Sequence, residues 1–298
     1  MNFHTYIKAV GTGKKHNRNL SEDEMFDATL QMLNQDIFPE QTSAFLLGWR
    51  INVESVDEFR GCLRALSTNV QKTEIENSIE IGYPYDGKVK NPYLFSLIAK
   101  VLEPHGLHVI VSGDALQPAK GGITTKEICT SIDIDKNLHY FDRSEYCPNL
   151  SNLSEIRMRL GLRTGLNTVE KLLNPAKSKY ALIGTFHKPF VEKYAKIFGD
   201  QYEKLIIVQG NEGTPEVFSK CKYWVCENGE VSEHYINPAD FGITYQKSWE
   251  AITLEESLEA IQNPSSELLK LAKLNAVLYL FIAGRIESIE EGWELYRK

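Results

Sequence analysis

The hydrophobic pattern of the chain changes about seventy residues from its N-terminus. Before that point, apolar residues recur at helical spacing in residues 25–33, 39–50 and 56–66. Ser21 precedes the acidic run EDE, which is typical of a helix N-terminus because the hydroxyl caps free N–H groups and acids favour the positive end of the helix dipole. The pattern predicts that the first seventy residues are all-helical.

Beyond residue 70, short apolar runs that end in or near glycine alternate with helical segments. Strands are predicted over residues 78–82, 107–113, 181–184 and 204–210, with helices over 93–102, 189–198 and 267–284. The order strand, helix, strand is typical of parallel strands joined by right-handed crossovers. A basic, mostly helical block over residues 150–179 interrupts this order. The fold class predicted is therefore α/β, with a parallel sheet.

Length and composition are those of an ordinary globular protein. The 298 residues are 42% hydrophobic and 24% charged, and a chain of this length buries a core without disulfides or a structural metal. The most apolar run, residues 276–283, is far shorter than the roughly 20 residues of a membrane span. Because the five cysteines are scattered and the N-terminal segment has no signal-peptide core, we expect a cytoplasmic protein with no membrane partner.

Positive charge is concentrated in two segments of a chain whose formal net charge is −7. Nucleic-acid-binding domains are usually basic, so the net charge alone argues against that class. However, residues 1–20 contain no acid, and residues 151–179 contain six bases and two acids. Solvated surface is the alternative interpretation of these segments. The candidate nucleic-acid contacts in them are Lys8, Lys14, Lys15, Arg18, Arg157, Arg159 and Lys171.

Loops that follow predicted strands contain residues with possible ligand chemistry. Glycines in residues 81–88 could turn N–H groups toward a phosphate, but Pro84 has no N–H and two tyrosines add bulk, so a structural turn is the alternative. Glu212 and Glu216 could hold Mg²⁺ or be solvated. The sequence of residues 11–15 lacks P-loop spacing, and no Ser/His/Asp or Cys/His arrangement stands out, which argues against a triad hydrolase.

Segments along nearly the whole chain are similar to a known family. They are residues 38–47 (FPEQTSAFLL), 56–61 (VDEFRG), 159–164 (RLGLRT) with 173–175 (LNP), and 274–276 (LNA) with Gly284. They resemble the anthranilate phosphoribosyltransferase superfamily, glycosyltransferase family 3. The resemblance implies a small all-helical domain, residues 1–69 with 150–178, through which two chains form a homodimer. It implies a larger α/β domain with a mostly parallel central sheet, residues 70–149 with 179–298.

The same resemblance identifies a phosphate- and substrate-like pocket. The family's phosphate loop GTGGD corresponds to GYPYD at residues 82–86, its NxST to NPYL at 91–94, and its KHGN to VSGD at 111–114. Its magnesium-binding Asp-Glu pair corresponds to residues 215–216, so Mg²⁺ is the cofactor expected if the protein is an enzyme. These departures predict no phosphoribosyl transfer to anthranilate. The pocket candidates are Gly82, Asp86, Gly87, Lys88, Asn91, Gly113 and Arg163.

A second branch of the superfamily matches some of these departures. The matching segments are YIKAVGTGKK at residues 6–15 with Arg18, YDGKVKNP at 85–92, TTKEI at 124–128 and the Glu212-Gly213 pair. They resemble homologues that bind nucleic acid without sequence preference, as dimers with basic grooves. Two functions stay open: a dimeric protein that binds single-stranded DNA or RNA, and a pentosyltransferase (phosphoribosyl transfer or nucleoside phosphorolysis) with altered phosphate contacts. The first predicts that the two basic segments form one groove.

Overall fold

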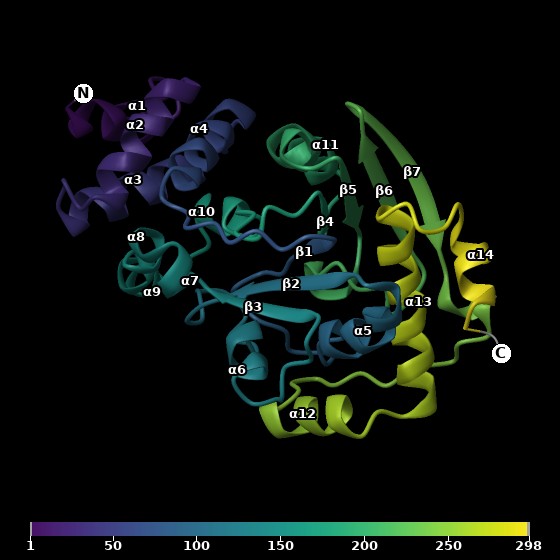
Figure 1. Ribbon diagram of the computed structural model, residues 1–298. Helices are drawn as coiled ribbons and strands as arrows, with labels where there is room; N and C mark the ends of the chain where they lie inside the picture. The colour runs from purple at the N-terminus through teal and green to yellow at the C-terminus, as the bar shows by residue number, and fades with distance from the viewer. Residues whose placement is uncertain (1, 297–298) are drawn as a thin grey trace.

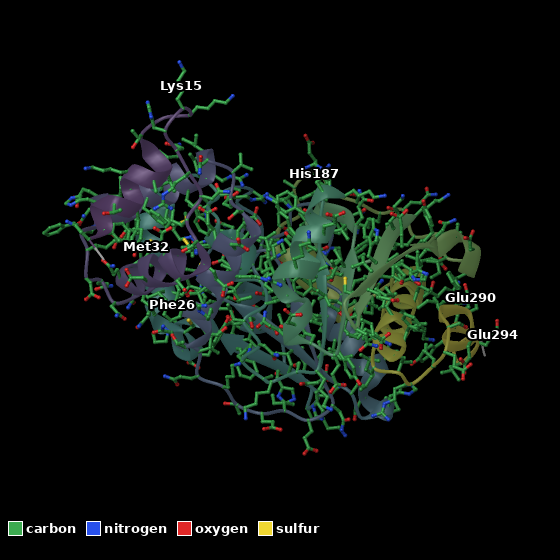
Figure 2. The ribbon with its side chains drawn as sticks, turned by 90° about the horizontal axis from the view of Figure 1, so that it is seen from above. Lys15, Phe26, Met32, His187, Glu290 and Glu294 are labelled. Atoms are coloured by element: carbon green, nitrogen blue, oxygen red, sulfur yellow. The ribbon has the colours of Figure 1, made fainter. Side chains whose placement is uncertain are left out.

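The computed structural model describes residues 2–296, and its N-terminal helices form a unit beside a central sheet (Figure 1). The second and fourth helices of this unit begin with capping boxes at Ser21 and Ser55. The sequence already indicates the helix start at Ser21. Residues 12–19 form an exposed loop, and Lys15 projects from it at the tip of the unit (Figure 2). The helices are α1 (Phe3–Gly11), α2 (Glu22–Leu33), α3 (Pro39–Ile51) and α4 (Val56–Ser67).

One sheet of seven strands, in the order β3-β2-β1-β4-β5-β6-β7, forms the centre of the larger unit. The first five strands of this order are parallel, and β6 and β7 form an antiparallel hairpin at one edge. The four predicted strands are present, which confirms the predicted fold class. The strands are β1 (Ser78–Gly82), β2 (His108–Gly113), β3 (Leu138–Asp142), β4 (Tyr180–Gly184), β5 (Lys204–Val208), β6 (Cys221–Glu227) and β7 (Glu230–Ile236).

Helices cover both faces of the sheet (Figure 1). Leu182 and Ile206 belong to the core beneath α5 and α13, whereas Ile183 and Ile207 belong to the core shared with α11 and the N-terminal helices. Because both faces are buried, β4 and β5 are almost continuously apolar in sequence, whereas β1 contains a buried glutamate, Glu80. The helices of this unit are α5 (Phe95–Leu102), α6 (Thr125–Cys129), α11 (Pro189–Phe198), α12 (Leu254–Gln262), α13 (Ser266–Ile282) and α14 (Ile289–Glu294).

Four short helices precede β4: α7 (Arg143–Tyr146), α8 (Pro148–Ser151), α9 (Ser154–Leu160) and α10 (Leu166–Val169). Of these, α9 contacts α3 and α10 contacts α4, so this basic block lies against the N-terminal helices. Short 3-10 turns cover residues 103–105, 199–201, 211–213 and 238–241. Within residues 2–296, none of the helices combines the length and the hydropathy needed to span a membrane.

Candidate functional site

A cavity of about 200 Å³ lies between the two units, at the carboxyl ends of β1 and β4. From β1 the chain adds β2 and β3 on one side of the sheet and then adds β4 and β5 on the other side of β1. The direction in which strands are added therefore reverses between β1 and β4. Open α/β sheets bind ligands at such points. The lining residues are Arg50, Pro84, Tyr85, Asp86, Arg163, Thr164, Asn167, Thr168, Lys171, Gly184, Thr185, Phe186, His187, Phe190, Tyr194, Glu212 and Gly213.

Cations on the cavity wall come from both units. Arg163 forms an ion pair with the buried Asp86 but keeps 39% of its side chain exposed. The Nζ of Lys171 lies 3.4 Å from the carbonyl oxygen of Gly184 and 3.2 Å from the hydroxyl of Tyr194. Arg50, at the end of α3, is exposed. An anion entering the cavity therefore meets positive charge that the protein has only partly neutralised.

A further cation adjoins the cavity from the loop after β2. Lys120 donates a 2.6 Å hydrogen bond from Nζ to the backbone carbonyl of Glu212, and the same atom lies 5.0 Å from the centre of the Phe186 ring. Burial lowers the pKa of Lys120 below its usual range, although Asp86 and Glu212 oppose that shift.

Most of the predicted phosphate pocket is packed inside the protein. The Lys88 side chain is 1% exposed, and its ammonium donates to Glu216 and, at 2.8 Å, to the carbonyl of Pro92. It also lies 5.0 Å from the ring centre of Tyr93 and 4.8 Å from that of Phe218. The prediction that Lys88 contacts a ligand is wrong, because aromatic rings and an ion pair enclose it.

The glycines and Asn91 of the predicted pocket are also held by the protein. A Cβ at Gly82 would lie 3.1 Å from Leu172 and Ile183, and one at Gly113 would lie 2.5 Å from Thr125. Gly87, with φ of 77°, lies against the backbone of Gly122. Asn91 is buried and donates its backbone N–H to Glu212. Among the seven pocket candidates, the cavity lining contains Asp86 and Arg163.

The two carboxylates considered for Mg²⁺ are already saturated with protein donors. Glu212 accepts the backbone N–H groups of residues 89, 90 and 91. Glu216 accepts the Lys88 ammonium, the Tyr83 hydroxyl and the backbone N–H of Leu94. No group of three or more potential metal ligands occurs within residues 2–296. These residues do not fit Mg²⁺, because the oxygens that would bind it hold the loop together instead.

The candidate nucleic-acid contacts lie in very different environments. Lys8, Lys14 and Lys15 are exposed without an ion-pair partner among the residues the structure describes. Arg18 is half-exposed and pairs with Glu24 at 2.6 Å, and Arg159 is 79% exposed and pairs with Glu155 at 2.5 Å. Lys171 lines the cavity.

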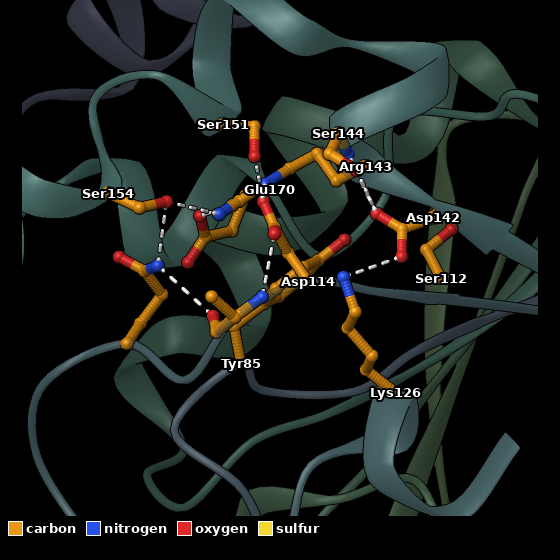
Figure 3. Close-up of polar contacts among 12 residues, drawn as sticks. Tyr85, Ser112, Asp114, Lys126, Asp142, Arg143, Ser144, Ser151, Ser154 and Glu170 are labelled. Carbon is orange, nitrogen blue, oxygen red and sulfur yellow. Dashed lines mark hydrogen bonds and ion pairs between the residues drawn. The ribbon is translucent and has the colours of Figure 1, made fainter. Parts of the chain in front are cut away.

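Arg157 is the exception among these candidates, since it is fully buried. Its guanidinium donates to both oxygens of Glu170, at 2.7 and 2.9 Å, and Glu170 also accepts from Arg143 (Figure 3). Arg143 in turn pairs with Asp114 at 2.7 Å. The prediction that Arg157 contacts nucleic acid is wrong, because this buried network uses its charge.

The exposed loop and the cavity are connected by the end of α3. The side-chain amide of Asn52 lies 3.3 Å from the carbonyl oxygen of Arg18 and 3.1 Å from the side-chain oxygen of Asn19. Two residues earlier in the chain, Arg50 lines the cavity. The loop with Lys14 and Lys15 is therefore attached to the same helix end that borders the cavity.

Sequence reasoning missed several residues of the site. Phe186 and His187 come two and three residues after the predicted strand 181–184, and their position after a parallel strand was a signal that could have found them. Lys120 precedes two glycines in a loop after another predicted strand. Arg50 offered no signal, because its place on the cavity depends on how α3 packs against α9 of the basic block.

Two family models match the chain. The helical bundle domain of the glycosyl transferase family matches residues 4–69, and the α/β domain of that family matches residues 123–298, more than half of the chain. The chain belongs to glycosyltransferase family 3. Proteins with matching sequences include an uncharacterized protein of Aquifex aeolicus, 29% identical over 94% of this chain and 93% of its own length.

Other relatives in the family are anthranilate phosphoribosyltransferases. The one from Thermoanaerobacter is 26% identical, over 92% of this chain and 88% of its own length. The Thermus thermophilus structure has a TM-score of 0.76 at 18% identity, covering 99% of this chain and 93% of its own. The Saccharomyces cerevisiae structure in complex with PRPP and Mg has a TM-score of 0.79 at 16% identity, covering 98% of this chain and 91% of its own. At these identities, the structural likeness shows the shared fold.

Proposed function

We propose that this family member binds single-stranded nucleic acid along a strip of positive charge that leads from the exposed loop at residues 12–19 into the cavity. The observation that carries the proposal is the arrangement of five cations. Lys14 and Lys15 lie on the loop that is bonded to the end of α3, Arg50 lies at that end, and Arg163 and Lys171 line the cavity beyond it.

The proposed strip is compatible with the net charge of the protein. Salt screens charges that lie farther away than about one Debye length, roughly 10 Å at 0.1 M salt. A bound phosphate is therefore attracted by the charges near it and not by the net charge of the whole protein. Two of the five strip cations are partly offset by ion pairs, Arg163 with Asp86 and Arg50 with Glu54, whereas Lys14, Lys15 and Lys171 have no ion-pair partner within residues 2–296. The net charge of −7 therefore leaves the strip able to attract a polyanion.

Phosphoribosyl transfer is less well supported than binding. Tyr83 and Tyr93, which stand in the segments that resemble the family's phosphate-binding motifs, are buried with ring centres 5.0 Å apart. The carboxylates considered for Mg²⁺ are occupied by protein donors. Loss of one positioned donor at such a site costs about 10² to 10³ in rate, and several are absent here together.

The test measures how binding of a dT-rich oligonucleotide changes with salt. Each phosphate contact with a single strand contributes about −0.7 to the slope of log K against log salt concentration. The double variant Lys14→Ala with Lys15→Ala is expected to weaken binding to every sequence alike and to flatten the slope by about one to two units.

The control removes two other exposed lysines, Lys136 and Lys179, which precede the amino ends of β3 and β4, whereas the cavity lies at the carboxyl ends of the strands. This control is expected to keep the wild-type slope. A parallel assay with phosphoribosyl pyrophosphate, Mg²⁺ and anthranilate is expected to show no turnover. The proposal is wrong if the oligonucleotide does not bind the wild type, or if the double variant of Lys14 and Lys15 binds it with unchanged affinity and unchanged salt dependence.

A further inference from the structure

The cavity contains an aromatic ring that the protein does not bury. Phe186 is 44% exposed, although most large apolar side chains of the described chain lie in its two cores. It follows the carboxyl end of β4 and lines the cavity together with Arg163 and Lys171. The ring thus lies beside the cations to which the proposed strip leads.

The ring is held in place from one side. A Cβ at Gly213 would lie 2.8 Å from two ring atoms of Phe186, and Gly213 has φ of 72°, so only glycine lets the ring approach this turn. The backbone carbonyl of Phe186 accepts a 3.2 Å hydrogen bond from the side chain of Gln209. These contacts place the ring before a ligand arrives, which lowers the entropy lost on binding.

The neighbours of the ring suit a nucleotide. The His187 ring centre lies 6.2 Å from that of Phe186, with a 40° angle between the planes, and the Lys120 ammonium lies 5.0 Å from the Phe186 ring centre. An aromatic ring binds the π-face of any base, and nearby cations bind the phosphate attached to it. A free phosphate or an inorganic anion would need the cations alone and would make no use of the ring.

We infer that Phe186 stacks against an unpaired base of the bound strand while Lys120 and Lys171 contact its phosphates. The inference rests on the proposed function and adds to it a base-binding residue. It also predicts a preference for single strands over duplexes, because bases that are paired and stacked in a duplex cannot offer a free face.

The experiment compares an oligo-dT with an oligonucleotide of the same length whose sugars carry no bases. Both strands have the same phosphates, so their affinity ratio isolates the contribution of the bases. Stacking of one base is expected to favour oligo-dT by about fivefold or more in the wild type. Phe186→Ala is expected to bring this ratio close to one and to leave the salt slope unchanged. Phe186→Trp is expected to keep the preference.

Two variants keep the test interpretable. Phe186→Leu retains an apolar side chain beside Gly213 but has no π-face, so it is expected to lose the preference even if the alanine variant folds poorly. Tyr235→Ala removes another exposed aromatic, on β7 and 61% exposed, and is expected to change nothing. A strand with 2-aminopurine supplies a second measurement, because stacking on Phe186 quenches its fluorescence.

The possible outcomes separate this inference from the proposed function. Equal affinity of the wild type for the two strands, or a preference that persists in both Phe186→Ala and Phe186→Leu, overturns the stacking role and leaves nucleic-acid binding intact. Failure of both strands to bind the wild type overturns the proposed function, and the inference with it.

Discussion

At the scale of single residues, Glu80 is a carboxyl group buried in the middle of β1. It accepts hydrogen bonds from the Tyr202 hydroxyl and the backbone N–H of Asn174. Burial raises its pKa to about 7, although both hydrogen bonds oppose the shift. Between pH about 4.5 and 7 the folded protein therefore keeps a proton that the unfolded chain has lost, so the free energy of unfolding falls as pH rises through that interval.

Replacing Glu80 by Gln is expected to remove this dependence, because an amide of the same shape has no proton to lose there. One pKa unit corresponds to about 1.4 kcal/mol, so the variant is expected to gain about 2.5 kcal/mol relative to wild type between pH 5 and pH 8. Urea unfolding at the two pH values measures the gain. If the free energy of unfolding changed with pH in the same way in both proteins, Glu80 would not be the source of the pH dependence.

At the scale of elements, a buried ionic network joins the sheet unit to the short helices before β4. Asp114 follows β2, Arg143 follows β3 and Glu170 comes directly after α10, and the three side chains lie together in Figure 3. Arg157, which also pairs with Glu170, lies in α9. Although burial alone would raise the pKa of Glu170, Arg157 and Arg143 hold it below its usual range. Each member of the network thus depends on partners from another element.

Replacing Glu170 by Gln is expected to destabilise the fold by about 3 to 5 kcal/mol, because it leaves buried arginine charge without its partner. The matched control is Glu155→Gln, which breaks the exposed pair with Arg159, 74% and 79% exposed, and is expected to cost less than about 1 kcal/mol. The measurement is the urea midpoint at constant m-value. Similar losses in both variants would show that the network contributes no more than a surface pair.

At the scale of the whole molecule, exposed apolar side chains gather on the helical unit. Phe38 precedes α3, Ile51 and Val53 lie at its other end, and Met158 and Leu162 lie in and after α9, which contacts α3. Groups of exposed apolar residues mark surfaces that bind other proteins. We propose that this surface pairs two copies of the chain.

Light scattering at micromolar concentration is expected to give twice the chain mass of 33.9 kDa. Replacing both Phe38 and Met158 by Asp is expected to halve that mass, because two buried charges without partners would face the interface, and neither residue lines the pocket that contains Lys14. Val231→Asp with Leu269→Asp, which alters exposed apolar residues on β7 and α13, is expected to keep the dimer. A monomeric wild type would refute the pairing.

The features that the sequence predicted correctly depend on near neighbours. The strands at residues 78–82 and 181–184 and the helix at 189–198 were evident because apolar spacing and flanking glycine and proline act within a few residues. Strand β3 was missed because most of its residues are half-buried, and the hairpin β6–β7 because its outer strand is largely polar. Edge strands carry a weaker apolar signal than central strands.

What only the tertiary structure decided is which charges face solvent. Arg157 and Arg159 are two positions apart in one basic run, yet in α9 Arg157 is buried and Arg159 is exposed. Arg157 can be buried because Glu170 accepts hydrogen bonds from its guanidinium. Lys88 forms its ion pair with Glu216, which is 128 positions away in the sequence. A buried charge requires a partner, and the topology of the sheet selects that partner over separations that local spacing does not encode. The cavity has the same origin, since its walls come from α3, α11, the segments after β1, β4 and β5, and the helical block before β4.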